Sequence, residues 1–108
     1  QDSPYEMKAS DEDKSIAQLN WVRASKRDHV IFFCLCILMN LAEDIAIEKK
    51  MVKKSLVKLL TEFLNHKSKK CIMKALEFLK KLSLYEENVL EMSDKKTNTL
   101  RKIASLLH

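Results

Sequence analysis

Histidine and cysteine are the side chains that most often bind metals or act as nucleophiles, and this sequence holds three of each. Cys34 and Cys36 form a Cys-x-Cys pair. Side chains two positions apart on a helix point to nearly opposite sides, so this pair cannot coordinate the same zinc ion. The histidines, which are His29, His66 and His108, are scattered along the chain and complete no ligand set. The sequence therefore predicts no metal site.

The other groups that could catalyse a reaction also have a structural explanation. No serine or cysteine stands beside a histidine in an arrangement that suggests a nucleophile and its base. The paired carboxylates at 43–44 and 86–87 fall at expected helix starts, where they stabilise the helix dipole. The sequence contains no glycine, so it can build neither a phosphate-cradling loop nor a dinucleotide-binding turn. We predict that the protein is not an enzyme and uses no cofactor or small-molecule substrate.

The composition predicts an all-α protein. Leucine, lysine, glutamate and alanine dominate, and Pro4 is the single proline. An odd number of cysteines, two of them in an apolar run, is typical of reduced thiols in a cytosolic protein. We expect these cysteines to be buried as small apolar side chains. The first residues are acidic and polar, unlike a signal peptide. The most apolar stretch, 30–42, is too short for a transmembrane segment.

A net charge of +5 and an isoelectric point near 9.1 favour acidic partners. Nucleic acid is one alternative, prompted by lysine runs such as "KSKK" at 67–70. These runs lack the interleaved aromatic residues on which single strands stack, and no recognition-helix motif is present. Nucleic-acid binding is therefore less favoured than binding of a protein.

Apolar spacing predicts a series of helices joined by short turns. Residues 1–10 lack periodicity and are expected to be flexible. Helices are expected at about 11–26, 28–42, 44–53, 56–64, 69–83, 86–92 and 95–107. Trp21 is expected to pack against the helix that follows it. The expected helix-starting residues are Ser10, either Ser25 or Asp28, Asp44, Ser55, Ser68 and Asp94.

Two stretches suggest an internal repeat. "LMNLAEDIAIEKKM" (38–51) and "LKKLSLYEENVLEM" (79–92) lie 41 residues apart, and each runs from a leucine-rich helix end through an acidic stretch to a methionine. At this offset Leu35, Leu38, Leu41 and Met51 align with Leu76, Leu79, Leu82 and Met92. At an offset of 43, Val57, Leu60, Phe63 and Leu64 align with Leu100, Ile103, Leu106 and Leu107. Three helices in roughly 40 residues is the armadillo period.

The predicted fold is therefore an all-α, armadillo-type right-handed α-solenoid of about one and a half to two three-helix repeats. Residues 1–10 form a flexible polar segment in this prediction, and 11–108 form the helical repeats. The repeats divide into 11–42 (end of one), 43–83 (a full one) and 84–108 (start of the next). Since about three repeats are usually needed for stability, we expect a piece of a longer array.

Several stretches go beyond a general armadillo pattern. "LMNLAED" (38–44), "EKKM" (48–51) and above all "FLKKLSLYEENVLEM" (78–92) resemble the kinesin-associated protein family, over about residues 30–108. The glycine usual before the second armadillo helix is replaced within "KKSLV" (53–57), which suits this family better than importin or catenin relatives.

The resemblance implies a non-catalytic subunit. This family supplies the armadillo-repeat, non-motor subunit of heterotrimeric kinesin-II, the motor of intraflagellar transport. Such a subunit would bind the tails of the paired motor subunits and link them to cargo or to membrane-associated adaptors. It would lie in the cytoplasm, associated with the cytoskeleton and cilium. A generic armadillo or HEAT-like protein-binding module is the alternative.

The third helix of each armadillo repeat lines a concave groove, which predicts where a partner would bind. In the expected helix 69–83, a polar stripe is formed by Lys70, Lys74, Glu77 and Lys81. Subtracting 41 places His29, Phe33, Cys36 and Asn40 in the same groove on the preceding helix. We expect this part-basic, part-apolar groove to receive an acidic protein segment. The alternative is that the lysines are only the solvated side of an amphipathic helix.

Asn40 resembles the groove asparagine of importin-like arrays. Cys36 stands where those arrays have a tryptophan, and Lys81 replaces the next asparagine. A basic groove would also repel a basic nuclear signal. The sequence thus disfavours an importin-type receptor.

Overall fold

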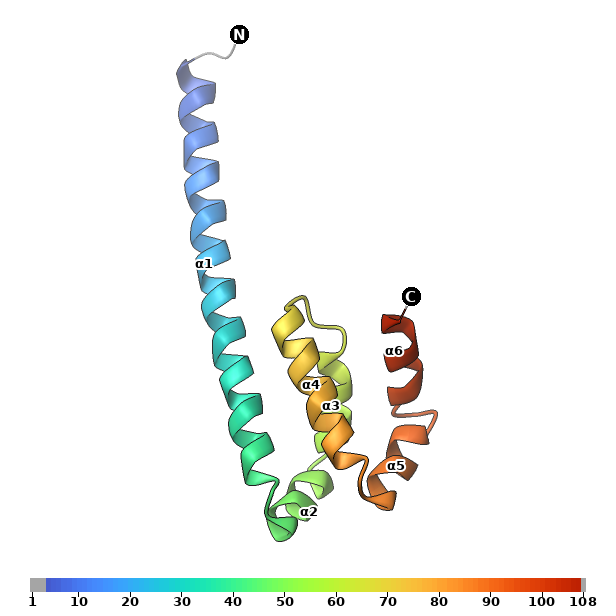
Figure 1. Ribbon diagram of the computed structural model, residues 1–108. Helices are drawn as coiled ribbons and strands as arrows, with labels where there is room; N and C mark the ends of the chain where they lie inside the picture. Colours follow the sequence, from blue (N-terminus) through green and yellow to red (C-terminus); the bar gives the residue numbers. More distant parts are fainter. Residues whose placement is uncertain (1–3, 108) are drawn as a thin grey trace. The chain divides into compact units, whose positions relative to one another are not determined.

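In the computed structural model, the described residues, 4–107, form six α-helices and no strand (Figure 1). The helices are α1 (Pro4–Leu41), α2 (Ile45–Lys53), α3 (Leu56–Phe63), α4 (Lys69–Leu82), α5 (Glu86–Ser93) and α6 (Thr99–Leu106). The prediction of an all-α protein is confirmed for this part of the chain. The chain divides into two compact units, Gln1–Val30 and Ile31–His108.

Helix α1 is longer than the sequence predicts. It begins at Pro4, so residues 4–10, which were expected to lack regular structure, are helical. Proline suits a first helical turn because its fixed φ is helical and its missing N–H has no helix partner there. The expected break near Asp28 is wrong, because neither glycine nor proline interrupts the chain there. No second helix starts at that point to cover Trp21, which is 70% exposed.

The starts of the short helices follow the predicted residues in part. Asp44 caps α2, its carboxylate accepting hydrogen bonds from the N–H groups of Ala46 (2.9 Å) and Ile47 (3.4 Å). Ser55 and Ser68 occupy the positions before α3 and α4, but neither side chain caps its helix.

Asp94 does not start the last helix, contrary to the prediction. It lies at the end of α5 with extended backbone angles, and its carboxylate accepts a hydrogen bond from the N–H of Lys96 (2.8 Å). Its carbonyl also accepts one from the N–H of Asn98 (3.0 Å). These bonds form a turn in place of a helical start, so α6 begins after Asn98.

The turn between α1 and α2 has the same hydrogen bonds as the turn between α4 and α5. The N–H of Ala42 donates to the carbonyl of Leu38 (2.9 Å), and 41 residues later Ser83 donates to Leu79 (2.9 Å). The next N–H donates from Glu43 to the carbonyl of Asn40 (3.2 Å), and its counterpart donates from Leu84 to Lys81 (3.3 Å). The third donates from Asp44 to Leu41 (3.2 Å), and its counterpart from Tyr85 to Leu82 (3.1 Å). The backbone of these two turns is therefore repeated.

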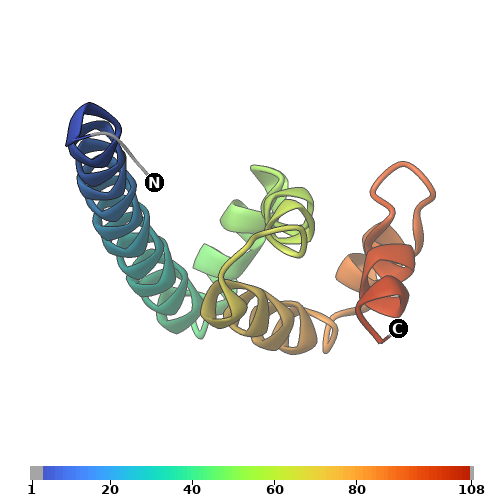
Figure 2. The ribbon, with the colours of Figure 1, turned by 90° about the horizontal axis from the view of Figure 1, so that it is seen from above.

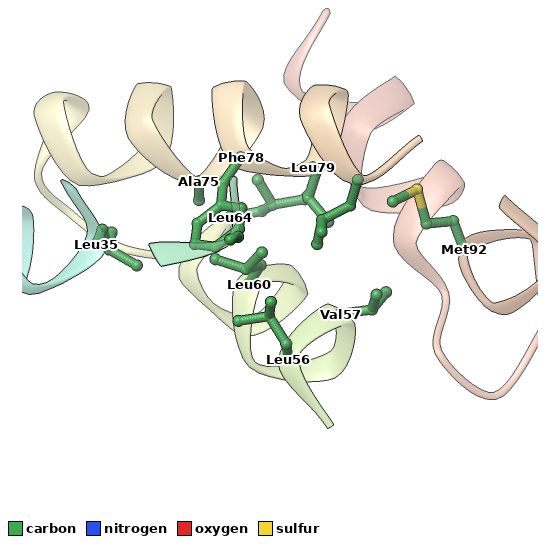
Figure 3. Close-up of a cluster of buried hydrophobic side chains, with 11 residues drawn as sticks. Leu35, Leu56, Val57, Leu60, Leu64, Ala75, Phe78, Leu79 and Met92 are labelled. Atoms are coloured by element: carbon green, nitrogen blue, oxygen red, sulfur yellow. The ribbon is translucent and has the colours of Figure 1, made fainter. Parts of the chain in front are cut away.

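The hydrophobic core of the second unit lies between the end of α1 and helices α3, α4 and α5 (Figure 3). Helix α3 lies against α4, and α5 against α6 (Figures 1 and 2). The buried apolar residues are Leu35, Ala42, Leu56, Val57, Leu60, Leu64, Ala75, Phe78, Leu79, Leu82 and Met92. Burying each large side chain contributes about 1.5–3 kcal/mol, so this cluster supplies much of the unit's stability.

Two pairs of buried polar side chains connect helices that lie three apart in the order of the chain. The amide of Asn88 donates hydrogen bonds to the carboxylate of Glu48 (2.9 Å) and to the carbonyl of Leu82 (3.0 Å). The hydroxyl of Thr61 donates to the carbonyl of Val57 (2.7 Å) and lies 2.7 Å from the hydroxyl of Thr99. These bonds tie α2 to α5 and α3 to α6.

Candidate partner-binding groove

A hollow of about 630 Å³ lies on the surface of the second unit, between α1 and α4, and is called the first hollow below. Phe32 of α1 forms one side. The remaining lining comes from one face of α4 and comprises Lys69, Lys70, Met73, Lys74, Leu76, Glu77 and Lys80. Helical spacing brings these side chains together, since residues three and four apart share a face.

Lys74 is held in place inside this hollow. Its ammonium group lies 2.9 Å from the carboxylate of Glu77 and 5.4 Å from the centre of the Phe32 ring. The hydrogen bond with Glu77 raises the pKa of Lys74 above its ordinary value. Because Lys74 is paired with a carboxylate and an aromatic face, it is less able to attract a ligand than an unpaired lysine.

Lys81 has a similar structural role. Its ammonium group donates hydrogen bonds to the carbonyl of Met39 (3.1 Å) and to the carboxylate of Glu43. These contacts join the end of α4 to the end of α1 and to the turn after it. Lys81 therefore contributes mainly to the wall of the groove.

A second hollow of about 480 Å³ adjoins the first along α4. It shares Glu77 and Lys80 with the first hollow, and the rest of its lining is Met39, Glu43, Lys81 and Leu84. We call the two hollows together the α4 groove.

The α4 groove contains only part of the predicted site. Lys70, Lys74, Glu77 and Lys81 line it. Phe33 and Asn40 are exposed on α1, Cys36 is half-buried, and none of the three lines either hollow. His29 is exposed and belongs to the other unit, Gln1–Val30.

Sequence reasoning missed the residues of α1 that face α4. Subtracting 41 from the α4 stripe gives Phe33 and Asn40 on α1. The side of α1 that lines the hollows instead carries Phe32 and Met39, each one residue before the predicted position. A one-residue shift rotates the side chain by about 100° around a helix. An apolar residue of α4 itself, Met73, is 64% exposed in the first hollow, although it does not belong to the polar stripe.

The charge of the α4 groove is carried by lysines that form no ion pair. Of the five lysines of α4, Lys74 and Lys81 are paired with carboxylates in the described part of the chain. Lys69, Lys70 and Lys80 are exposed and have no such partner among the described residues. The groove is therefore an apolar surface with net positive charge at its edge.

The three cysteines differ in exposure. Cys71 is buried in α4 as predicted, Cys36 is half-buried, and Cys34 is exposed, which contradicts the expected burial. Across residues 4–107 no group of three or more histidine, cysteine, aspartate or glutamate side chains could hold a metal ion. The described helices also include none that is long and apolar enough to cross a membrane.

The family model for kinesin-associated protein (KAP) matches residues 1–108, which is the whole sequence. The match therefore extends to residues 1–29, beyond the stretch on which the sequence resemblance rests. No solved structure matches the chain. Because this family model matches the full length of the chain, the chain belongs to the kinesin-associated protein family.

Proposed function

We propose that the chain is part of an armadillo-type α-solenoid in the non-motor subunit of heterotrimeric kinesin-II. In this role it is a scaffold without catalytic activity, which binds the paired motor subunits and links them to cargo in microtubule-based and intraflagellar transport. The observation that carries the proposal is the repeated backbone of the α1–α2 and α4–α5 turns in a chain of this family.

Exposed apolar faces support a solenoid that continues. Val57 and Leu64 are buried in the core, whereas their counterparts at an offset of 43, Leu100 and Leu107, are 54% and 82% exposed. A further helix placed on α6 as α4 lies on α3 would bury them. At the other side of the second unit, an apolar stripe of α1 is exposed at Phe33, Ile37 and Leu41, as expected of a surface that a preceding repeat covers.

The proposed repeats keep the boundaries expected from the sequence, with a full repeat at 43–83 between the end of one at 11–42 and the start of the next at 84–108. Each repeat buries its apolar faces against its neighbours and leaves a continuous surface for other proteins. The proposed site of action is the cytoplasm, at the cytoskeleton and cilium.

Size-exclusion chromatography tests this function. The longer subunit that contains this chain, mixed with the coiled-coil tails of a kinesin-II heterodimer, is expected to elute as one complex. A core variant, Leu60→Asp, provides a control for folding of the repeats, because it places a carboxylate where Leu60 is fully buried. Separate elution of the intact subunit and the motor tails would contradict the proposed function.

A further inference from the structure

We propose that the α4 groove binds an acidic protein segment carrying two apolar anchor residues, one for each hollow. This inference names a partner class for the scaffold proposed above. It depends on the geometry of the groove, and it can be tested separately from binding of the motor tails.

The first hollow suits a large apolar side chain. Its floor is formed by Phe32, Met73 and Leu76, and Met73 is 64% exposed. The unbranched thioether of methionine adapts its shape to different ligands, and its sulfur contacts aromatic rings favourably. A volume of about 630 Å³ lies within the range of small ligand sites, so one anchor side chain and the adjoining backbone can enter it.

The unpaired lysines set the spacing of acidic residues in the ligand. Lys69 and Lys70 lie at one end of the first hollow, and Lys80 lies at the other. At about 1.5 Å per residue, Lys70 and Lys80 are roughly 15 Å apart along α4. About five residues of extended chain cover that distance. With one acidic residue at Lys70 and the other at Lys80, the central residue of the five-residue segment lies near Met73. This central residue is the first apolar anchor.

The second hollow gives the segment a direction. Beyond Lys80 it offers the apolar side chains of Met39 and Leu84, and Leu84 is 80% exposed. Glu43 and Glu77 also line it, and each is already paired with a lysine, Glu43 with Lys81 and Glu77 with Lys74. The second anchor is accordingly apolar and follows the second acidic residue.

A protein segment fits these observations better than a nucleic acid or a membrane. The face of the Phe32 ring is already covered by the Lys74 ammonium group, which leaves no free stacking platform for a base. The lysines border two hollows with apolar walls, whereas binding to a flat bilayer surface requires no such hollows.

The test uses the longer subunit and the fluorescent peptide Asp-Glu-Ala-Phe-Ala-Glu-Ala-Leu, measured by fluorescence anisotropy. The double variant Lys70→Glu and Lys80→Glu is expected to weaken peptide binding by about tenfold or more, because two attractions become repulsions. Lys58→Glu, an equal charge change per site on the exposed side of α3, is the matched control and should change the affinity less than about twofold.

A second peptide, with serine in place of phenylalanine and leucine, tests the anchors. It is expected to bind at least about tenfold more weakly, since two apolar side chains no longer leave water. Equal binding of the two peptides, or equal binding by all protein variants, would overturn the inference. So would binding of phosphatidylserine vesicles or oligo(dT) that depends on Lys70 and Lys80 when the peptide does not bind.

The same double variant separates this inference from the proposed function. Loss of peptide binding with normal co-elution of the motor tails supports the groove as a site for another acidic partner. Loss of both supports the groove as a site that the motor tails share. If the unaltered subunit binds the peptide but not the motor tails, the proposed function fails and the inference stands.

Discussion

Ser55 and Asn98 have the same left-handed backbone conformation, and they stand 43 residues apart. Ser55 has φ 69° and ψ 35° before α3, and Asn98 has φ 63° and ψ 23° before α6. The same offset aligns Leu56–Phe63 with Thr99–Leu106, so the two helices agree in length and in the backbone conformation of the residue that precedes them. A left-handed conformation costs most non-glycine residues about 1–2 kcal/mol. Its recurrence at equivalent positions indicates that the two connections have the same construction.

Replacing Ser55 with glycine should stabilise the protein. Glycine adopts a positive φ without steric cost, although it loses more backbone entropy on folding, so the expected net gain is about 0.5–1 kcal/mol. Asn98→Gly should gain less, because asparagine tolerates this conformation better than serine does. The free energy of unfolding in urea measures both changes.

Ser83→Gly is the matched control for these variants. Ser83 has φ −67° at the end of α4, where glycine offers no relief of strain. It should lower the free energy of unfolding by about 0.5–1 kcal/mol. Equal effects of glycine at Ser55 and Ser83 would show that the left-handed conformation is not the cause.

Asn88→Ala should destabilise the protein by about 2–3 kcal/mol, because it removes the donor that the buried Glu48 carboxylate uses. Replacing both partners, with Glu48→Met and Asn88→Leu, should recover part of that loss, since no buried carboxylate is then left without its donor and the Leu82 carbonyl keeps its bond from the N–H of Tyr85. Asn65→Ala, at an exposed asparagine, serves as the control and should change stability by less than about 0.5 kcal/mol. The double-mutant cycle uses Glu48→Met, Asn88→Leu and their combination, and effects of the two single changes that simply add would refute the coupling.

The hydroxyl pair of α3 and α6 should respond unequally to the two valine substitutions. Thr61→Val removes the acceptor for Thr99 and the bond to the Val57 carbonyl, and should cost about 1–3 kcal/mol. Thr99→Val leaves the bond from Thr61 to Val57 intact and should cost less. Thermal unfolding compares the two variants, and a larger loss from Thr99→Val would contradict the assigned donors.

Glu91 should make stability fall as the pH rises through the mildly acidic range. Burial, and secondly the nearby Asp94 carboxylate, raise the pKa of Glu91 above its ordinary value of 4.5. Between the unfolded and the folded pKa the folded state binds more protons, so stability decreases with rising pH there and stays lower above it. Glu91→Gln should remove this decrease, so its stability relative to the original protein should rise with pH. An unchanged pH profile of the free energy of unfolding would contradict the effect of burial on Glu91.

Local rules predicted α2 to α5 closely, whereas α6 begins at Thr99, later than expected. Asp44 marks the start of α2 because its side chain can cap, and the apolar spacing of Leu60, Leu79 and Leu82 marks the inner faces of α3 and α4. The length of α1 was missed because its first half shows little apolar periodicity. Such a helix depends on continuous helix-forming residues and on a favourable Pro4, and neither contributes to a pattern of apolar residues.

The composition of the α4 groove was harder to predict because it depends on which helix faces which. The stripe on α4 was found from spacing alone, but the facing side of α1, with Phe32 and Met39, follows from three-dimensional packing. Spacing also gave no information on ion pairs. Lys74 and Lys81 were expected to bind a partner, whereas each already contacts a carboxylate from within the chain.

The central claim is that α2–α4 form one three-helix repeat of a protein-binding solenoid and that α5 and α6 are the first two helices of the next repeat. An electron cryo-microscopy structure of the longer subunit bound to its motor tails tests it most directly. We expect α5, α6 and the next helix to superpose on α2, α3 and α4, with that next helix covering Leu100 and Leu107. A structure in which a different kind of element covers α6, or in which α5 and α6 fail to superpose on α2 and α3, would contradict the claim.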